Sequence, residues 1–422
     1  MKTNVSKISR NFAGYAIAIL AILGGFTSCD NEEPSMPLVT VNVETAGTLP
    51  TLISSKDKHK ITDLALTGNL NGIDIRFIRE MAGSDAEGKK TNGKLSTLDL
   101  SGTNIVEDND ENNYYLYYDP TNNDERDGVA YYSVDNVIGD YMFFDCGKLK
   151  SVILPENIIE IGNQAFYNCI KLAAIVIPNS VTSIKGWSFS NCESLASVTI
   201  GNSVALIEYN AFHSCTALNS VTIPNSITKI DPFTFDDCTG LTEIIVASDN
   251  GCYSSLEGVL FDKGKTELVC FPIAKAATSY TIPNSVVNVG NYAFSNCIKL
   301  ASVTMPNSVV KIGASSFLGC KGLTFVAIGS SVAEIESGAF SGCSALKSVT
   351  IPGSVTTIGQ SAFYYCIGLK EIYSENSVPP VCTVDAFNMV SKTDCKIYVP
   401  AGSKTAYSTA AEWKAFKTIV EK

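Results

Sequence analysis

Cysteine is the most chemically capable residue type in this chain of 422 residues, because thiolates bind metal ions, form disulfides and attack electrophiles. Nine of the fourteen cysteines recur with a constant 23-residue period, interrupted by one longer gap between Cys238 and Cys297. They are Cys146, Cys169, Cys192, Cys215, Cys238, Cys297, Cys320, Cys343 and Cys366. A metal site in such a column would receive one ligand per unit, without a histidine or a C-x-x-C partner. We therefore predict no metal ion and no cofactor, and interpret the column as buried thiols that pack as small hydrophobic side chains.

Histidine, the usual partner of a nucleophilic cysteine, occurs only at positions 59 and 213. His213 lies two residues before Cys215, which suggests a nucleophile and its base. The equivalent positions in the two preceding units hold Tyr167 and Ser190, so this position tolerates unrelated side chains. The sequence also contains no G-x-S-x-G, P-loop or H-E-x-x-H pattern. We predict that the protein is not an enzyme.

Four further cysteines lie outside the regular column, in segments that depart from the repeat. Cys252 with Cys270 and Cys382 with Cys395 are the pairs that could form disulfides in an exported protein. The spacing alone leaves both pairings open.

The residues around the cysteines repeat with the same period. Phenylalanine stands three residues before each of the nine and leucine three residues after, as in residues 177–199, IPNSVTSIKGWSFSNCESLASVT. L-x-x-V-x-I predicts a short parallel strand with its apolar residues inside, S-V-x-x-I a second short strand, and A-F-x-x-C a helical turn. Serines such as Ser180, Ser226 and Ser308 are expected to hydrogen-bond the turn backbone. The predicted fold is an α/β solenoid of stacked 23-residue units, a right-handed superhelix with a parallel β-sheet, capped at both ends.

The outward strand positions are the first candidate binding surface. Most of them hold serine, threonine or alanine, and such a flat face has no paired carboxylates for acid–base chemistry. Among the larger or charged exceptions, the residues that we expect to contact a ligand are Glu243, Phe325, Glu371 and Tyr373.

An acidic, tyrosine-rich segment is the second candidate. Residues 107–127 hold eight carboxylates against one arginine, and the tyrosines Tyr114, Tyr115, Tyr117 and Tyr118 lie among them. Aromatic residues on a loop are good contact residues for proteins or sugars. The alternative is that they cover the open end of the first repeat. Asp108, Asp110 and Asn112 alternate as in a calcium loop, but the turn glycine and the final glutamate are missing, so calcium binding stays open.

The N-terminus has the pattern of an export signal. Lys2, Lys7 and Arg10 precede the apolar residues 12–26, which are too few to span a membrane comfortably, and the signal peptide is predicted to end at residue 28. Cys29 is the predicted site of lipidation, followed by an acidic tether at residues 29–37. We expect a lipid-anchored protein of the outer membrane, at the cell surface, with a periplasm-facing location as the alternative. The net charge of −11 makes nucleic acid a poor partner.

The repeat resembles that of the BspA-like leucine-rich-repeat proteins, a family of Bacteroides-type surface lipoproteins. Residues 180–200 and 354–372 match a pattern of the form SVTSIG..AF.GCSSLTSVTIP closely. The resemblance implies a repeat array at 137–373, with a hairpin-bearing insertion at about 246–281.

The resemblance extends to both ends of the chain. Residues 61–81 and 95–103 are similar to the family's N-terminal cap, placed here at 38–136, and residues 397–419 to its C-terminal cap, placed at 374–422. The family implies a surface protein that binds a protein or glycan ligand, with adhesion to host components proposed for some members. The alternative function is a structural or assembly component that binds another envelope protein.

Overall fold

The computed structural model describes residues 37–108, 110–118 and 129–422, and Leu38–Lys422 form one compact unit. The predicted signal peptide, Cys29 and the tether up to residue 36 lie outside the described residues. So do residues 119–128 of the acidic segment and the side chain of Tyr118.

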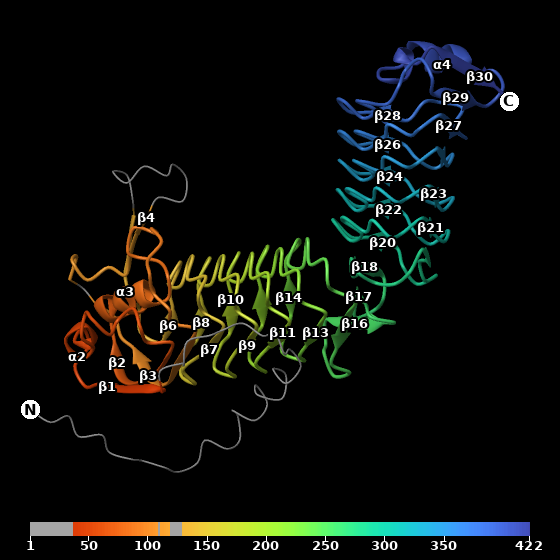
Figure 1. Ribbon diagram of the computed structural model, residues 1–422. Coiled ribbons are helices and arrows are strands. Elements are labelled where there is room, and N and C mark those ends of the chain that lie inside the picture. Colours follow the sequence, from red (N-terminus) through yellow and green to blue (C-terminus); the bar gives the residue numbers. More distant parts are fainter. Residues whose placement is uncertain (1–36, 109, 119–128) are drawn as a thin grey trace, which may run out of the picture. The chain divides into compact units, whose positions relative to one another are not determined.

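Each unit contributes one longer strand and one short strand to separate parallel sheets (Figure 1). Neighbouring units pair residue for residue at the repeat interval, as in Ser197↔Ala174 and Val198↔Ile175. In most of the longer strands the second residue is buried and the residues on either side of it are more exposed, as alternation along a strand requires; β19 is the exception, because Tyr280 is only half-buried. The longer strands are β7 (Ser151–Ile153), β9 (Ala174–Val176), β11 (Ser197–Thr199), β13 (Ser220–Ile223), β15 (Glu243–Val246), β19 (Ser279–Thr281), β21 (Ser302–Thr304), β23 (Phe325–Ala327), β25 (Ser348–Ile351) and β27 (Glu371–Ser374).

The short strands form the second side of the solenoid. They are β6 (Val137–Ile138), β8 (Glu160–Ile161), β10 (Ser183–Ile184), β12 (Leu206–Ile207), β14 (Lys229–Ile230), β20 (Asn288–Val289), β22 (Lys311–Ile312), β24 (Glu334–Ile335), β26 (Thr357–Ile358) and β28 (Val381–Cys382).

The third side of each unit is a hydrogen-bonded turn, so the expected helical turn is wrong. Gln164 and Asn168 adopt left-handed backbone conformations, with φ of 52° and 59°. The N–H of Phe166 donates to the carbonyl of Ser188 in the next unit at 2.7 Å, and that of Asn168 donates to Ser190 at 2.9 Å. A helix would use these donors within its own segment, whereas here they join neighbouring units.

The core of each array contains two columns of side chains. The phenylalanine rings stack along the solenoid, with Phe166 and Phe189 having centroids 5.2 Å apart and planes 4° apart. Beside them, the thiol of Cys169 donates to the carbonyl of Phe143 at 3.2 Å, and the same contact recurs along the column. All nine column cysteines are buried.

The insertion forms a hairpin, as the resemblance to the repeat family implies. Strands β16 (Tyr253–Leu256) and β17 (Val259–Asp262) pair antiparallel, and β18 (Glu267–Cys270) joins β17 to the short-strand sheet through β20. The hydrophobic core is divided here, because Leu260 packs into the first array and Val259 and Phe261 into the second. Phe271 then restarts the phenylalanine column by stacking on Phe294.

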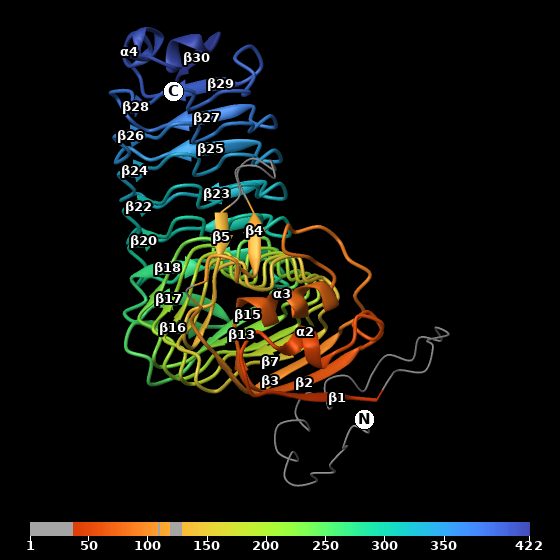
Figure 2. The same ribbon diagram turned by 90° about the vertical axis from the view of Figure 1, so that its left-hand side faces the viewer.

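The N-terminal end of the array is closed by sheet and helix (Figure 2). Strands β1 (Val39–Val43), β2 (Asp63–Leu70) and β3 (Thr97–Ile105) extend the longer-strand sheet, while α2 (Leu49–Leu52) and α3 (Gly72–Met81) cover the core. Arg79 of α3 is fully buried and donates to the carbonyls of Tyr141 and Met142, both at 3.1 Å. In later units the equivalent carbonyl accepts a hydrogen bond from a backbone N–H of the preceding unit. Met142 lies in the first unit, so Arg79 supplies this donor instead.

The C-terminal end is closed by aromatic residues. After β29 (Lys396–Val399) come α4 (Lys404–Thr409), a 3₁₀ turn (Trp413–Ala415) and β30 (Thr418–Glu421). The phenylalanine column continues to Phe387, and Trp413 and Phe416 pack against that last ring with centroids 5.1 and 5.5 Å away. The open end of the column is thereby removed from water.

The expected serine ladder is also wrong at three of its positions. The hydroxyls of Ser180, Ser226 and Ser308 are buried without a hydrogen-bond partner. The preceding asparagine performs this role instead, because the side-chain oxygen of Asn179 accepts from the backbone N–H of Asn202 at 2.8 Å. The longer amide side chain reaches the next unit.

We predict that Phe317→Ala lowers the free energy of unfolding by about 3–5 kcal/mol, because the buried ring leaves a cavity between its stacked neighbours. Phe325→Ala is the matched control, since the ring of Phe325 is 52% exposed, and its expected effect is below about 1 kcal/mol. Urea unfolding followed by circular dichroism measures both. Equal effects of the two substitutions would contradict the packing described here.

Candidate functional site

The outward face of the second array ends in a pair of stacked tyrosines. Tyr373 on β27 lies beside Tyr398 on β29, with ring centroids 4.7 Å apart and planes 10° apart. Glu371 accepts hydrogen bonds from the Tyr373 hydroxyl at 2.9 Å and from the Tyr398 hydroxyl at 3.3 Å. The ammonium of Lys422 lies 4.8 Å from the centroid of the Tyr373 ring. We call these four residues the tyrosine platform.

The chemistry of the tyrosine platform suits binding rather than catalysis. Its hydrogen bond to Glu371 raises the pKa of Tyr373, so the phenol stays neutral and its ring remains available for stacking. The stacked pair presents ring edges and hydroxyl groups that can contact a sugar or an apolar side chain, while the carboxylate and ammonium groups fix orientation by hydrogen bonds.

The four strand residues singled out from the sequence do not form one site. Glu371 and Tyr373 lie together in the platform, and Phe325 is on β23, separated from β27 by β25. Glu243 lies in the first array beside the hairpin, where the backbone N–H of Ile244 donates to the carbonyl of Gly258. Sequence reasoning missed Tyr398, because its separation from Tyr373 along the chain is longer than one repeat interval.

The tyrosine segment is largely a cover for the first repeat. Tyr115 was predicted to contact a ligand, and this is wrong: its side chain is only 1% exposed, and its hydroxyl donates to the carbonyl of Asp140 at 2.7 Å. Burial raises its pKa far above the usual range. Tyr114 and Tyr117 are half-buried, and the Arg76 guanidinium lies 4.4 Å from the Tyr114 ring.

The possible calcium loop is satisfied by its own neighbours. Asp108 accepts hydrogen bonds from the amides of Asn71 and Asn113, and Asp110 accepts from the backbone and side chain of Asn112. Among the residues that the structure describes, no group of three or more acidic, histidine or cysteine side chains is placed to hold a metal ion.

His213 does not form a catalytic triad, although Ser190 and Asp236 flank it along one column. The Ser190 hydroxyl is 3.4 Å from Nδ1 of His213, and Nε2 is 4.0 Å from the Asp236 carboxylate. The second distance is too long for a hydrogen bond, and Ser190 is fully buried, so a substrate has no access to its oxygen. Ser190, His213 and Asp236 therefore pack side by side as equivalent residues of successive units.

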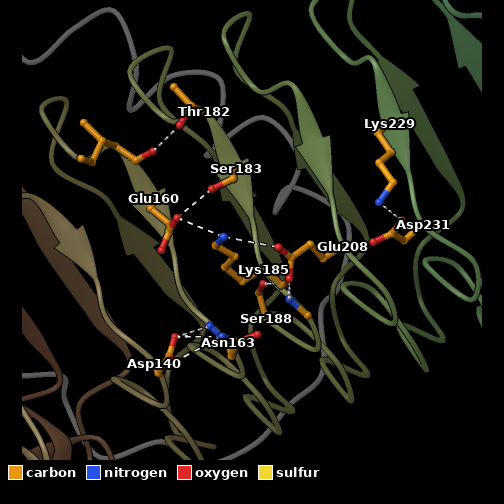
Figure 3. A network of polar contacts seen from close by, with 12 residues as sticks. Asp140, Glu160, Asn163, Thr182, Ser183, Lys185, Ser188, Glu208, Lys229 and Asp231 are labelled. Carbon is orange, nitrogen blue, oxygen red and sulfur yellow. Dashed lines mark hydrogen bonds and ion pairs between the residues drawn. The ribbon is translucent and has the colours of Figure 1, made fainter.

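Charged side chains also bridge successive units on the short-strand side (Figure 3). Lys185 lies 3.4 Å from Glu160 and 3.3 Å from Glu208, and the Ser183 hydroxyl donates to Glu160 at 2.9 Å. Because the charge of Lys185 is balanced by carboxylates of both adjacent units, this network is structural.

The thirteen cysteines in the described part of the chain are free thiols, including both candidate disulfide pairs. Burial raises the pKa of Cys146 to about 11 and that of Cys366 to about 12. The four thiols outside the column differ, since Cys252 is exposed whereas burial raises the pKa of Cys270 to about 12. A protonated, buried thiol is a poor nucleophile and a poor metal ligand.

These features define a leucine-rich-repeat solenoid with an open strand face and structural thiols. The family described as the BspA type leucine rich repeat region matches residues 136–255 and 268–392, in six copies. The chain belongs to this family, and the predicted fold class is confirmed. In the described residues, no helix has the length and hydrophobicity needed to cross a bilayer.

Two solved structures place the chain among bacterial repeat proteins. A leucine rich cell surface protein from Faecalibacterium prausnitzii is 30% identical, with a TM-score of 0.54, over 68% of this chain and 80% of that one. The pneumococcal vaccine antigen PcpA shares the fold at 23% identity and a TM-score of 0.55, over 68% of this chain and 77% of its own. A search of curated proteins found no significant match.

We predict that Cys252 alone reacts rapidly when the folded chain from residue 38 onward is treated with iodoacetamide at pH 8. At that pH a buried thiol with a pKa of about 12, such as Cys366, is ionised in only about one molecule in ten thousand. Only the ionised thiol reacts, so the buried thiols react slowly. Mass spectrometry of tryptic peptides identifies the labelled residues, and labelling in guanidinium chloride gives the total. Rapid labelling of Cys320 or Cys366 in the folded protein would show that the column is accessible.

Proposed function

We propose that this protein binds a protein or glycan ligand at the cell surface through the outward face of its longer strands, with the tyrosine platform as the main contact. The observation that carries the proposal is the stacked pair Tyr373 and Tyr398, which lies at the end of this face with a carboxylate and an ammonium group beside it.

The contrast with the rest of the face supports this choice. At equivalent positions most units hold serine, threonine or alanine, whereas the second array presents Phe325, Tyr373 and Tyr398 within a few strands. Phe325 is 52% exposed. Burying its ring against a ligand would contribute about 25 cal/mol for each Å² of apolar surface removed from water. Aromatic residues dominate the energetics of binding surfaces, so their position marks the contact region.

Display at the cell surface is supported by two independent features. The relative from Faecalibacterium prausnitzii is described as a cell surface protein. In this chain, Cys29 follows a basic and apolar leader, which is the arrangement of a lipidated cysteine, and the acidic residues behind it provide a solvated tether. Adhesion to host components is the use that we propose for the binding face.

We predict that the chain from residue 38 onward binds saturably to at least one member of a panel of extracellular-matrix proteins, mucins and glycans. Tyr373→Ala should weaken that binding about tenfold or more, because a contact aromatic is lost. Tyr364→Ala is the matched control, since Tyr364 is an exposed tyrosine that lies in a turn away from the strand face. Surface plasmon resonance at physiological salt measures both.

Two results would count against this proposal. If no member of the panel binds, host adhesion is contradicted, and the result favours the alternative function, a component that binds another envelope protein. An equal loss of binding in Tyr364→Ala and Tyr373→Ala would move the contact away from the tyrosine platform.

We also predict that Cys29→Ser releases the protein from the membrane fraction, because the thiol is the proposed attachment point of the lipid. Fractionation of cells with an antibody against the repeat array measures the distribution, and Cys252→Ser, which changes an exposed thiol of the insertion, serves as the control. Membrane retention of the Cys29→Ser variant would refute lipid anchoring. Protease treatment of intact cells separates surface display from a periplasm-facing location.

A further inference from the structure

A cavity of about 360 Å³ lies where the insertion separates the two arrays. It is lined by the last short strand and turn of the first array, by β17 and β18, and by the first turn of the second array. No residue of the longer strands β13 and β15 lines it, so it is distinct from the tyrosine platform and its strand face. Its volume falls within the range of about 300–1,000 Å³ found for small-molecule sites.

Two aromatic rings meet at this cavity. Phe233 and Tyr292 occupy the same position in their units, five residues before the column cysteine, and both have left-handed backbone conformations with φ of 63° and 58°. In a regular array these positions would be one repeat interval apart, but the insertion brings them together across the junction, with ring centroids 3.5 Å apart. The hydroxyl-bearing ring of Tyr253 adds a third aromatic wall.

The charge of the lining is wholly negative. Asp231, Asp236, Asp237, Asp262 and Glu267 line the cavity, and no lysine or arginine does. Three of these carboxylates are already engaged, because Asp231 pairs with Lys229 at 2.7 Å, Asp237 accepts from Ser214, and Asp262 accepts from Thr266.

The other two carboxylates, Asp236 and Glu267, are less fully engaged. In the described part of the chain, the partner of the Asp236 carboxylate is the distant His213 ring, whose Nε2 lies 4.0 Å away. Among the described residues, none forms a hydrogen bond or ion pair with the Glu267 carboxylate, and the nearby Lys311 is bound to Glu336 at 2.7 Å. Asp236 is half-buried and Glu267 is exposed, so a cation can reach both carboxylates, and the described protein residues balance neither charge fully.

A buried hydroxyl points to the same conclusion. Ser295 lines the cavity, is 8% exposed, and its side-chain oxygen has no hydrogen-bond partner. Burying a hydroxyl without a partner is unfavourable, so a ligand that donates a hydrogen bond here would remove that cost.

We propose that this junction cavity binds a small organic cation, an alkylammonium or guanidinium group, as a second ligand site beyond the proposed strand-face function. Asp236 and Glu267 provide the countercharge, and the rings of Phe233 and Tyr292 interact with the cation through their faces. Ser295 accepts one of its hydrogen bonds. The cation comes either from a free polyamine or from a lysine or arginine side chain of a partner protein, and the two sources present the same chemistry.

Isothermal titration of the chain from residue 38 onward with spermidine, and separately with a lysine-containing acetylated peptide, tests this proposal at physiological salt. We expect one equivalent of at least one of these cations to bind, and glucose and acetate not to bind. Glu267→Gln and Ser295→Leu should each weaken the binding at least tenfold. Leucine is chosen because Leu318 occupies the equivalent position in the next unit, so the repeat accommodates it.

Glu193→Gln is the control, because it removes one exposed carboxylate of the first array and should leave the affinity unchanged. Binding of spermidine but not of the peptide assigns a free polyamine as the ligand, and the reverse assigns a protein side chain. The proposal is overturned if neither cation binds, if glucose binds better than both, or if several equivalents bind equally in the wild-type, Glu267→Gln and Ser295→Leu proteins. Thermal melting of each variant confirms that it is folded before titration.

Discussion

No unit of this protein can bury its own core, and the rest of the structure follows from that constraint. A 23-residue unit exposes its phenylalanine ring, its thiol and several backbone donors until the next unit covers them. The stacked rings, the thiol–carbonyl contacts and the turn hydrogen bonds all join one unit to its neighbour. Stability is therefore a property of the interfaces between units, as in other solenoids.

The same constraint explains the ends and the junction. Arg79 supplies donors to carbonyls that no preceding unit can reach, and Trp413 and Phe416 cover the last ring of the column. At the insertion the column stops and restarts at Phe271, with Ala274 in the place of the cysteine. The side chains around the interruption no longer follow the repeat, and the cavity lies there.

A uniform interior leaves the outward positions free to vary, and this separates stability from binding. The chemically capable thiols are committed to packing, and burial raises their pKa values. The features suited to recognition are departures from the repeat: the exposed ring of Phe325, the tyrosine platform and the acidic, aromatic lining of the junction cavity. The residues that depart from the repeat are therefore the candidates for binding, since the repeated residues stabilise the fold.

The sequence by itself determined the interval of the units, their two strands and the buried columns of phenylalanine and cysteine, because each depends on a short pattern of apolar residues repeated many times. The hairpin in the insertion occurs once, and it was expected only from the resemblance to the family. Contacts between units were decided only by the tertiary structure. The A-F-x-x-C segment satisfies a local helical pattern, but its N–H groups donate to the next unit and it forms a turn. Tyr115 lies in a polar stretch and yet is buried against the first repeat. Tyr398 reaches Tyr373, and Phe233 reaches Tyr292, across separations that differ from the repeat interval, so no periodicity could have paired them.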